Sequence, residues 1–114
     1  MQPLSTRNGW DQGRGIFATP VSDHRNVLML ETGEAKFIDV PRGASYASFG
    51  FSDDTWVVYL PADAPPTIAE VTSDITDGSA PDFNPTLRLL DEGTKKIGFL
   101  TDADDAIVQV SFFG

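Results

Sequence analysis

Short apolar segments, separated by turn-forming residues, constrain the fold of this chain more than any other feature of its sequence. Between residues 26 and 60 four such segments recur about every ten residues, and Gly, Pro and Asp occupy many of the positions between them. That spacing leaves no room for the helices that connect parallel strands. In the last segment, 106–113, Val108, Val110 and Phe112 share one face, which is typical of a strand with one side on a core.

The pattern predicts seven strands, with an eighth, shorter one in a long connection. The predicted ranges are 26–31, 35–40, 45–51, 55–60, 86–90, 94–100 and 106–113, and the short strand is 68–72. We expect the first four to form a meander that starts with a hairpin around Gly33, and 91–93 to be a second hairpin turn. The predicted fold is all-β: an antiparallel β-sandwich of jelly-roll type with about 7–8 short strands. An eight-stranded closed barrel is the main alternative.

Residues 1–25 differ in charge and composition from the rest of the chain. They carry a net charge of +1, whereas residues 26–114 carry −10. Three Gly, two Pro and no apolar period predict an extended N-terminal arm over 1–25, followed by one β-sandwich domain over 26–114. The apolar residues of the arm either fold back onto the domain or dock on another chain. The proline-rich connection 61–84 is a second candidate contact surface.

The overall composition excludes several classes of partner. The 114 residues include 17 acidic and 8 basic ones, and this negative field repels nucleic acids and anionic membranes. There is no cysteine, so disulfides and thiolate chemistry are excluded. The apolar runs are far shorter than a membrane span, and the first residues do not look like a signal peptide.

No motif predicts catalysis, a metal or a cofactor. His24 is the only histidine, and the sequence shows no acid partner for it. Most acidic residues lie in predicted turns, where aspartate caps backbone N–H groups. The acidic turn 102–105 is the best candidate for calcium, but it lacks the twelve-residue loop with its Gly and closing Glu. We therefore expect no enzyme activity, no cofactor and no bound metal.

The aromatic residues admit two roles. Trp10, Tyr46 and Tyr59 could line a sugar-binding platform, whereas Trp56 is expected in the core. Trp56 and Tyr59 lie on opposite faces of one predicted strand, so at most one of them belongs to such a platform.

Several short motifs follow one another in an order that resembles a known group of proteins. They are 39–44 (DVPRGA), 46–49 (YASF), 55–59 (TWVVY), 77–79 (DGS), 84–91 (NPTLRLLD) and 110–114 (VSFFG). In this order they resemble small head proteins of tailed bacteriophages that decorate or cement the capsid. The resemblance implies a non-enzymatic β-sandwich that binds the major capsid protein and forms a dimer or trimer. It also implies a place on the outer surface of the virion after synthesis in the host cytoplasm.

The arm and the long connection are the segments expected to make the capsid or inter-subunit contacts. The residues expected there are Arg7, Trp10, Arg14, Ile16, Phe17, Ile68 and Phe83. The alternative function is a carbohydrate-binding β-sandwich module of a phage tail or surface adhesin, which would use exposed aromatic residues. A metal-dependent jelly-roll enzyme is excluded, because it needs a cluster of histidine ligands.

Overall fold

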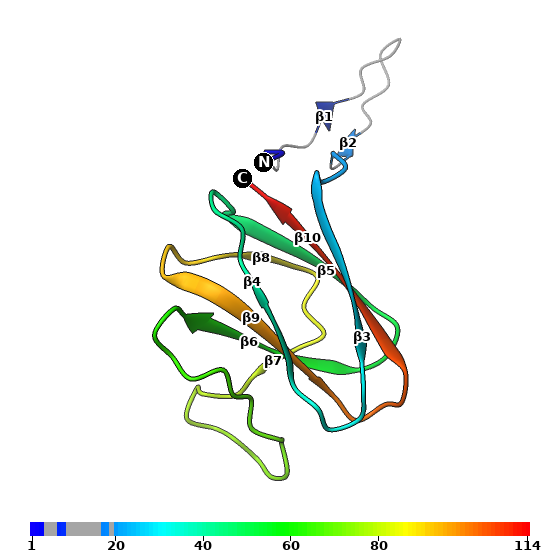
Figure 1. The fold of residues 1–114 in the computed structure, drawn as a ribbon, viewed down its shortest axis with the longest axis vertical. Coiled ribbons are helices and arrows are strands. Elements are labelled where there is room, and N and C mark those ends of the chain that lie inside the picture. The colour runs from blue at the N-terminus through cyan, green and yellow to red at the C-terminus, as the bar shows by residue number, and fades with distance from the viewer. Residues whose placement is uncertain (4–6, 9–16, 19) are drawn as a thin grey trace.

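The computed structural model describes residues 1–3, 7–8, 17–18 and 20–114, and every regular element in this part of the chain is a β-strand. The strands are β1 (Arg7–Asn8), β2 (Phe17–Ala18), β3 (His24–Leu30), β4 (Lys36–Asp39), β5 (Tyr46–Phe51), β6 (Thr55–Pro61), β7 (Asp82–Phe83), β8 (Leu87–Leu89), β9 (Thr94–Thr101) and β10 (Ala106–Phe113). Strands β3 to β10 form two four-stranded sheets that enclose one core (Figure 1). The predicted all-β sandwich is therefore confirmed.

The strands pair in a nested order. One sheet has the order β3-β10-β5-β8 and the other has the order β4-β9-β6-β7. All pairs are antiparallel, and the outermost pair in sequence, β3 with β10, encloses β4 with β9, then β5 with β8, then β6 with β7. Two separate sheets exclude the closed barrel.

The predicted meander and its two hairpins are wrong. The turn at Gly33 has the expected left-handed backbone, with a φ of +72°, but β3 and β4 on either side of it belong to different sheets. The 90–93 turn likewise leads from β8 in one sheet to β9 in the other. The amide of Gly33 donates to the carbonyl of Thr101 at 3.0 Å, which holds the crossing loop against the end of β9. The length of a loop does not show whether the strands on either side of it pair with each other, and here each of them pairs with a distant segment.

The core lies between the two sheets and follows the predicted alternation. Its buried residues are Leu28, Leu30, Ala47, Phe49, Val57, Leu90, Ile97, Phe99, Ala106, Val108, Val110 and Phe112. The rings of Phe49 and Phe99, from opposite sheets, meet edge to face with centroids 6.2 Å apart. The two inner faces therefore form one continuous apolar layer.

The connection between β6 and β7 is long and irregular, and the predicted strand at 68–72 is absent from it. Pro65 and Pro66 precede that range and cannot donate to a strand ladder, which disfavours pairing there. Instead, β7 pairs with the start of β6, Trp56 lying opposite Phe83. The chain bends at 77–79, where the amide of Ser79 donates to the carboxylate of Asp77 at 3.0 Å. Figure 1 shows this connection reaching away from both termini.

Candidate functional site

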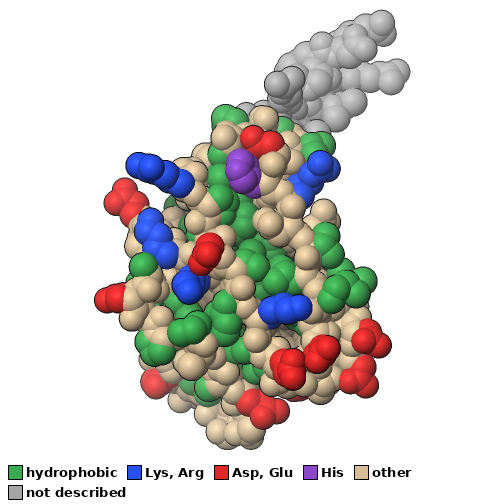
Figure 2. Space-filling view, viewed as in Figure 1, with side chains coloured by type: hydrophobic (Ala, Val, Ile, Leu, Met, Phe, Trp, Pro, Cys, Tyr) green, Lys and Arg blue, Asp and Glu red, His purple; other side chains and the backbone are tan. Residues whose placement is uncertain are grey.

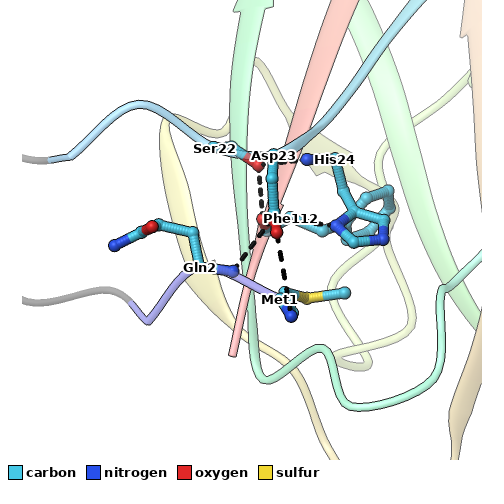
Figure 3. Close-up of polar contacts among 6 residues, drawn as sticks. All are labelled: Met1, Gln2, Ser22, Asp23, His24 and Phe112. Atoms are coloured by element: carbon cyan, nitrogen blue, oxygen red, sulfur yellow. Dashed lines mark hydrogen bonds and ion pairs between the residues drawn. The ribbon is translucent and has the colours of Figure 1, made fainter.

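The two described ends of segment 1–25 lie next to each other, beside the end of β10. The amide of Gln2 donates to the Asp23 carboxylate at 2.9 Å, and the carbonyl of Gln2 accepts from the amide of Gly114 at 2.9 Å. The buried Ser22 hydroxyl donates to the carbonyl of Phe112 at 2.6 Å (Figure 3). These contacts, which we call the anchor, fix both ends of the segment to the end of β10.

The anchor bears only on the two described ends of segment 1–25, and most of the predicted extended arm lies outside the described residues. Met1 packs against the core, and its side chain is only 5% exposed. Strand β1 pairs antiparallel with β2, so these two parts of the segment run in opposite directions. His24 and Arg25 already belong to β3. Burial of Met1 and the bonds of Gln2 explain why the start of the chain stays on the domain.

His24 has an acid partner that sequence reasoning missed. Its Nδ1 lies 2.9 Å from the carboxylate of Asp23, and both side chains are exposed. The neighbouring Ser22 hydroxyl donates to the carbonyl of Phe112 and accepts from the amide of His24, so the imidazole does not activate it. Ser22, Asp23 and His24 therefore join the start of β3 to β10, and they do not form a pair of nucleophile and base.

The anchor should respond to acid. The hydrogen bond from His24, followed by that from the amide of Gln2, lowers the pKa of Asp23 from 3.8 to about 2. A lowered pKa means that the bond from Gln2 to the Asp23 carboxylate is formed above pH 3.8 and is lost as the pH falls toward 2. We expect the amide proton resonance of Gln2 to titrate with a midpoint near pH 2. An Asp23→Asn variant should lack this titration, and a midpoint at the ordinary aspartate value would contradict the anchor.

The outer side of the β3-β10-β5-β8 sheet is apolar and almost uncharged. The large apolar side chains exposed on it are Val27, Met29, Leu87, Leu89 and Ile107. Arg25 is the only charged residue that the four strands direct outward, since Arg88 lies opposite the buried Ala47 and so turns inward. We call this surface the neutral face. In a chain of net charge −9, so large a carboxylate-free surface is an unusual feature.

One end of the sandwich, by contrast, is strongly acidic. The loops β3–β4, β5–β6 and β9–β10 meet there, and their acidic residues are Glu31, Glu34, Asp53, Asp54, Asp102, Asp104 and Asp105. Figure 2 shows acidic side chains gathered toward this end, on the side away from the termini. In the part of the chain that the structure describes, no three acidic or histidine side chains converge as a metal would require. In the acidic turn 102–105, the carboxylate of Asp104 accepts a hydrogen bond from the hydroxyl of Thr32.

An exposed aromatic pair lies beside this acidic end. Trp56 points to the outer side of its sheet and is half-buried, so the prediction that it packs in the core is wrong. Its ring centroid is 4.4 Å from that of Phe83, which is 47% exposed. The pair lines a hollow of about 490 Å³ together with Ala103 and three carboxylates, those of Asp53, Asp54 and Asp102. We call it the aromatic hollow.

A polar clamp holds Phe83 in place from the other side. The Arg88 guanidinium donates to both oxygens of Asp82, at 2.9 and 3.2 Å, and the Tyr59 hydroxyl donates to the same carboxylate at 2.9 Å. Burial raises the pKa of Tyr59, and the bond to Asp82 raises it further. Burial also raises the pKa of Asp82, but the hydrogen bonds from Arg88 and Tyr59 outweigh this effect and lower the carboxyl pKa overall. The clamp joins β6, β7 and β8 across the two sheets.

The predicted sugar platform does not form from the described residues expected in it. Tyr59 faces inward with its hydroxyl committed to Asp82, whereas Tyr46 lies half-buried on the neutral face, on the other sheet. Trp10 lies outside the described residues. The two tyrosines therefore do not share a surface.

The predicted contact residues have different outcomes. Phe83 is exposed, as a contact residue must be, and Ile68 is half-buried in the β6–β7 connection. Trp10, Arg14 and Ile16 lie outside the described residues, as do the side chains of Arg7 and Phe17. The neutral face was missed, although the outward positions of the predicted strands 26–31 and 86–90 already held its apolar residues.

Comparison of the chain with protein-family models, with curated proteins and with solved structures found no match. Among the described residues, none forms a helix long and apolar enough to cross a membrane.

Proposed function

We propose that this chain is a non-enzymatic virion protein that binds the major capsid protein lattice of a tailed bacteriophage head and stabilises it. The single observation that carries the proposal is the neutral face, an exposed apolar sheet surface on an otherwise acidic protein. The order of motifs from 39 to 114, which resembles phage decoration proteins, supplies the class of partner. The protein would act on the outer surface of the virion, after synthesis in the host cytoplasm, as a dimer or trimer.

The fold we propose for this role is a jelly roll. The nested pairing of β3 with β10, β4 with β9, β5 with β8 and β6 with β7 supports this topology. It corresponds to one long antiparallel hairpin that wraps so that successive pairs alternate between two sheets. Such a framework presents the outer side of one sheet to a partner.

The charge distribution favours docking through the neutral face. A protein of net charge −9 repels acidic surfaces at a distance, and this repulsion is weakest where no carboxylate lies between the partners. Val27, Met29 and Leu89 are 63%, 56% and 72% exposed, so covering them removes apolar surface from water.

The size of the face implies several contacts at once. Four strands spaced about 4.8 Å apart, with about six residues each, span about 400 Å². A stable protein–protein interface covers about 800 Å² on each partner. The neutral face therefore needs a second contact, such as segment 1–25 or another subunit of an oligomer. Multivalent placement on a lattice would then convert modest contacts into firm attachment.

Binding to capsid shells tests the proposal. We expect the wild-type protein to co-sediment with shells that lack it, at a regular saturating stoichiometry. Val27→Asp combined with Leu89→Asp should weaken binding at least tenfold, because each substitution places an unpaired carboxylate in an apolar interface. Ile75→Asp is the comparison variant, since Ile75 is exposed in the β6–β7 connection and not on the face. Weaker binding of this variant as well would place a contact on the connection, whereas unchanged binding would confine the effect to the neutral face.

The contradicting results are equally concrete. Unchanged stoichiometry for the double variant would show that the neutral face does not bind the capsid. A wild-type protein that does not co-sediment with shells would contradict the proposed function. Deletion of residues 1–20 is a poor test, because it also removes Met1 from the core and Gln2 from the anchor.

A further inference from the structure

We propose that the aromatic hollow is a binding site for a guanidinium group, occupied by an arginine side chain of another protein chain. The hollow is separate from the neutral face, because Trp56 and Phe83 belong to the β4-β9-β6-β7 sheet. The inference thus goes beyond the proposed function and does not depend on what covers the neutral face.

The first argument is the exposure of the aromatic pair. Phe83 ends a two-residue strand and leaves 47% of its surface exposed, although Trp56 beside it is half-buried. The rings are inclined by 44° to each other, so they present a stepped aromatic surface at the hollow. Aromatic faces carry negative charge density and attract cations, and the guanidinium stacks on them as a flat group.

The second argument is the polar character of the lining. Apart from the indole N–H of Trp56, the side-chain polar groups that line the hollow are three carboxylates, which only accept hydrogen bonds. The amide group of Asn84, next to the hollow, is already used: its nitrogen donates to Asp54 at 2.8 Å and its oxygen accepts from the amide of Thr55. A complementary ligand must therefore be rich in donors, and the indole N–H is the one side-chain donor in the lining that an acceptor could meet.

The third argument is charge. No lysine or arginine lines the hollow, and it opens at the acidic end of the sandwich. The guanidinium has five N–H donors, no acceptor, a fixed positive charge and a planar shape that fits a carboxylate with two parallel bonds. An ammonium group matches the charge but not the stacking, and a neutral sugar matches neither the charge nor the donor excess. Arginine is thus the side chain that fits all three features.

The test is a titration followed by NMR at about 150 mM salt, where the Debye length is about 8 Å and diffuse attraction is largely screened. The probe is N-acetyl-arginine amide, and the comparison probes are N-acetyl-lysine amide and the uncharged N-acetyl-citrulline amide. We expect arginine to shift the amides of 53–56, 83 and 102–103 and the indole proton of Trp56. Lysine should bind more weakly, and citrulline should leave these signals unchanged.

Three variants locate the contact. Phe83→Ala should weaken arginine binding about two- to fivefold through loss of the cation–π contact. Asp102→Asn should weaken it by a similar factor of about two to five, the range of an exposed ion pair. Asp105→Asn is the control: it removes the same charge from the same loop, outside the hollow, and asparagine tolerates the positive φ of 54° there.

Two outcomes would overturn the inference. Equal binding of lysine and arginine, with Asp105→Asn as damaging as Asp102→Asn, would mean diffuse attraction to the acidic end. Shifts at the hollow with methyl glucoside but none with arginine would mean a saccharide site. Shell binding of the Phe83→Ala variant, measured in parallel, separates this result from the proposed function, since that variant keeps the neutral face.

Discussion

Replacing Phe99 by alanine is expected to lower the free energy of unfolding by about 3–5 kcal/mol, the usual range for a buried phenylalanine. Phe99 is fully buried in β9, and its ring meets the ring of Phe49 from the opposite sheet. Its removal leaves a cavity between two sheets that are each fixed by their own hydrogen bonds. The sheets therefore cannot close the gap without giving up their pairing.

Urea denaturation measures this loss, because the midpoint should fall while the slope stays constant. Leu89→Ala is the control, since Leu89 is 72% exposed and its truncation should change stability by no more than about 0.5 kcal/mol. Equal losses in the two variants would mean that the apolar layer between the sheets does not hold them together.

Gly98→Ala is expected to destabilise the protein by about 1–3 kcal/mol through overpacking. An added Cβ at Gly98 would lie 2.7 Å from Cδ1 of Phe37 and 3.0 Å from Cγ2 of Val58, both closer than normal contact. Phe37 in β4 and Val58 in β6 flank Gly98 on the outer side of the sheet. The glycine is needed there because the aromatic ring of Phe37 lies over its backbone.

The matched control is Gly50→Ala, which lies within β5 on the neutral face. The nearest atom to an added Cβ is Cβ of Gln109, at an ordinary 4.0 Å. This substitution should change stability by no more than about 0.5 kcal/mol. Thermal melts of the two variants give the comparison, and a harmless Gly98→Ala would show that Phe37 turns away without cost.

Much of the local structure could be predicted from the sequence. Alternation of apolar residues located the seven main strands to within a residue or two, because a side chain in a strand faces either the core or solvent. A turn was expected at Gly33, and this glycine has the positive φ that glycine tolerates. These features depend on neighbouring residues alone.

What the sequence did not reveal was sheet membership. The short loop at Gly33 has hairpin length, yet β3 finds its partner in β10 and β4 finds its partner in β9. Register and pairing depend on which distant segment buries the same face, and one sequence carries no signal for that. The nested order from which we propose the jelly roll becomes visible only when these distant partners are known.

The candidate sites were predicted least well, for a related reason. Phe83 was selected because it lies in a proline-rich connection, but its partner Trp56 was placed in the core. Alternation shows that Trp56 and Val57 face opposite ways, but not which side the core lies on when both are apolar. The acidic residues near the pair were interpreted only as turn residues, since their loops meet only in the folded chain.

The pairing of β3 with β10 also bears on how the chain reaches its fold. Leu30 lies opposite Ala106, and β10 separates β3 from β5 in their sheet. Until residues 106–113 have left the ribosome, β3 has no neighbour in its sheet and Leu28 and Leu30 have no completed core to enter. Folding of the sandwich must therefore wait for residues 106–113 and then close many distant contacts together, which makes it slow. During synthesis the unpaired edge of β3 is the segment most exposed to pairing with other chains.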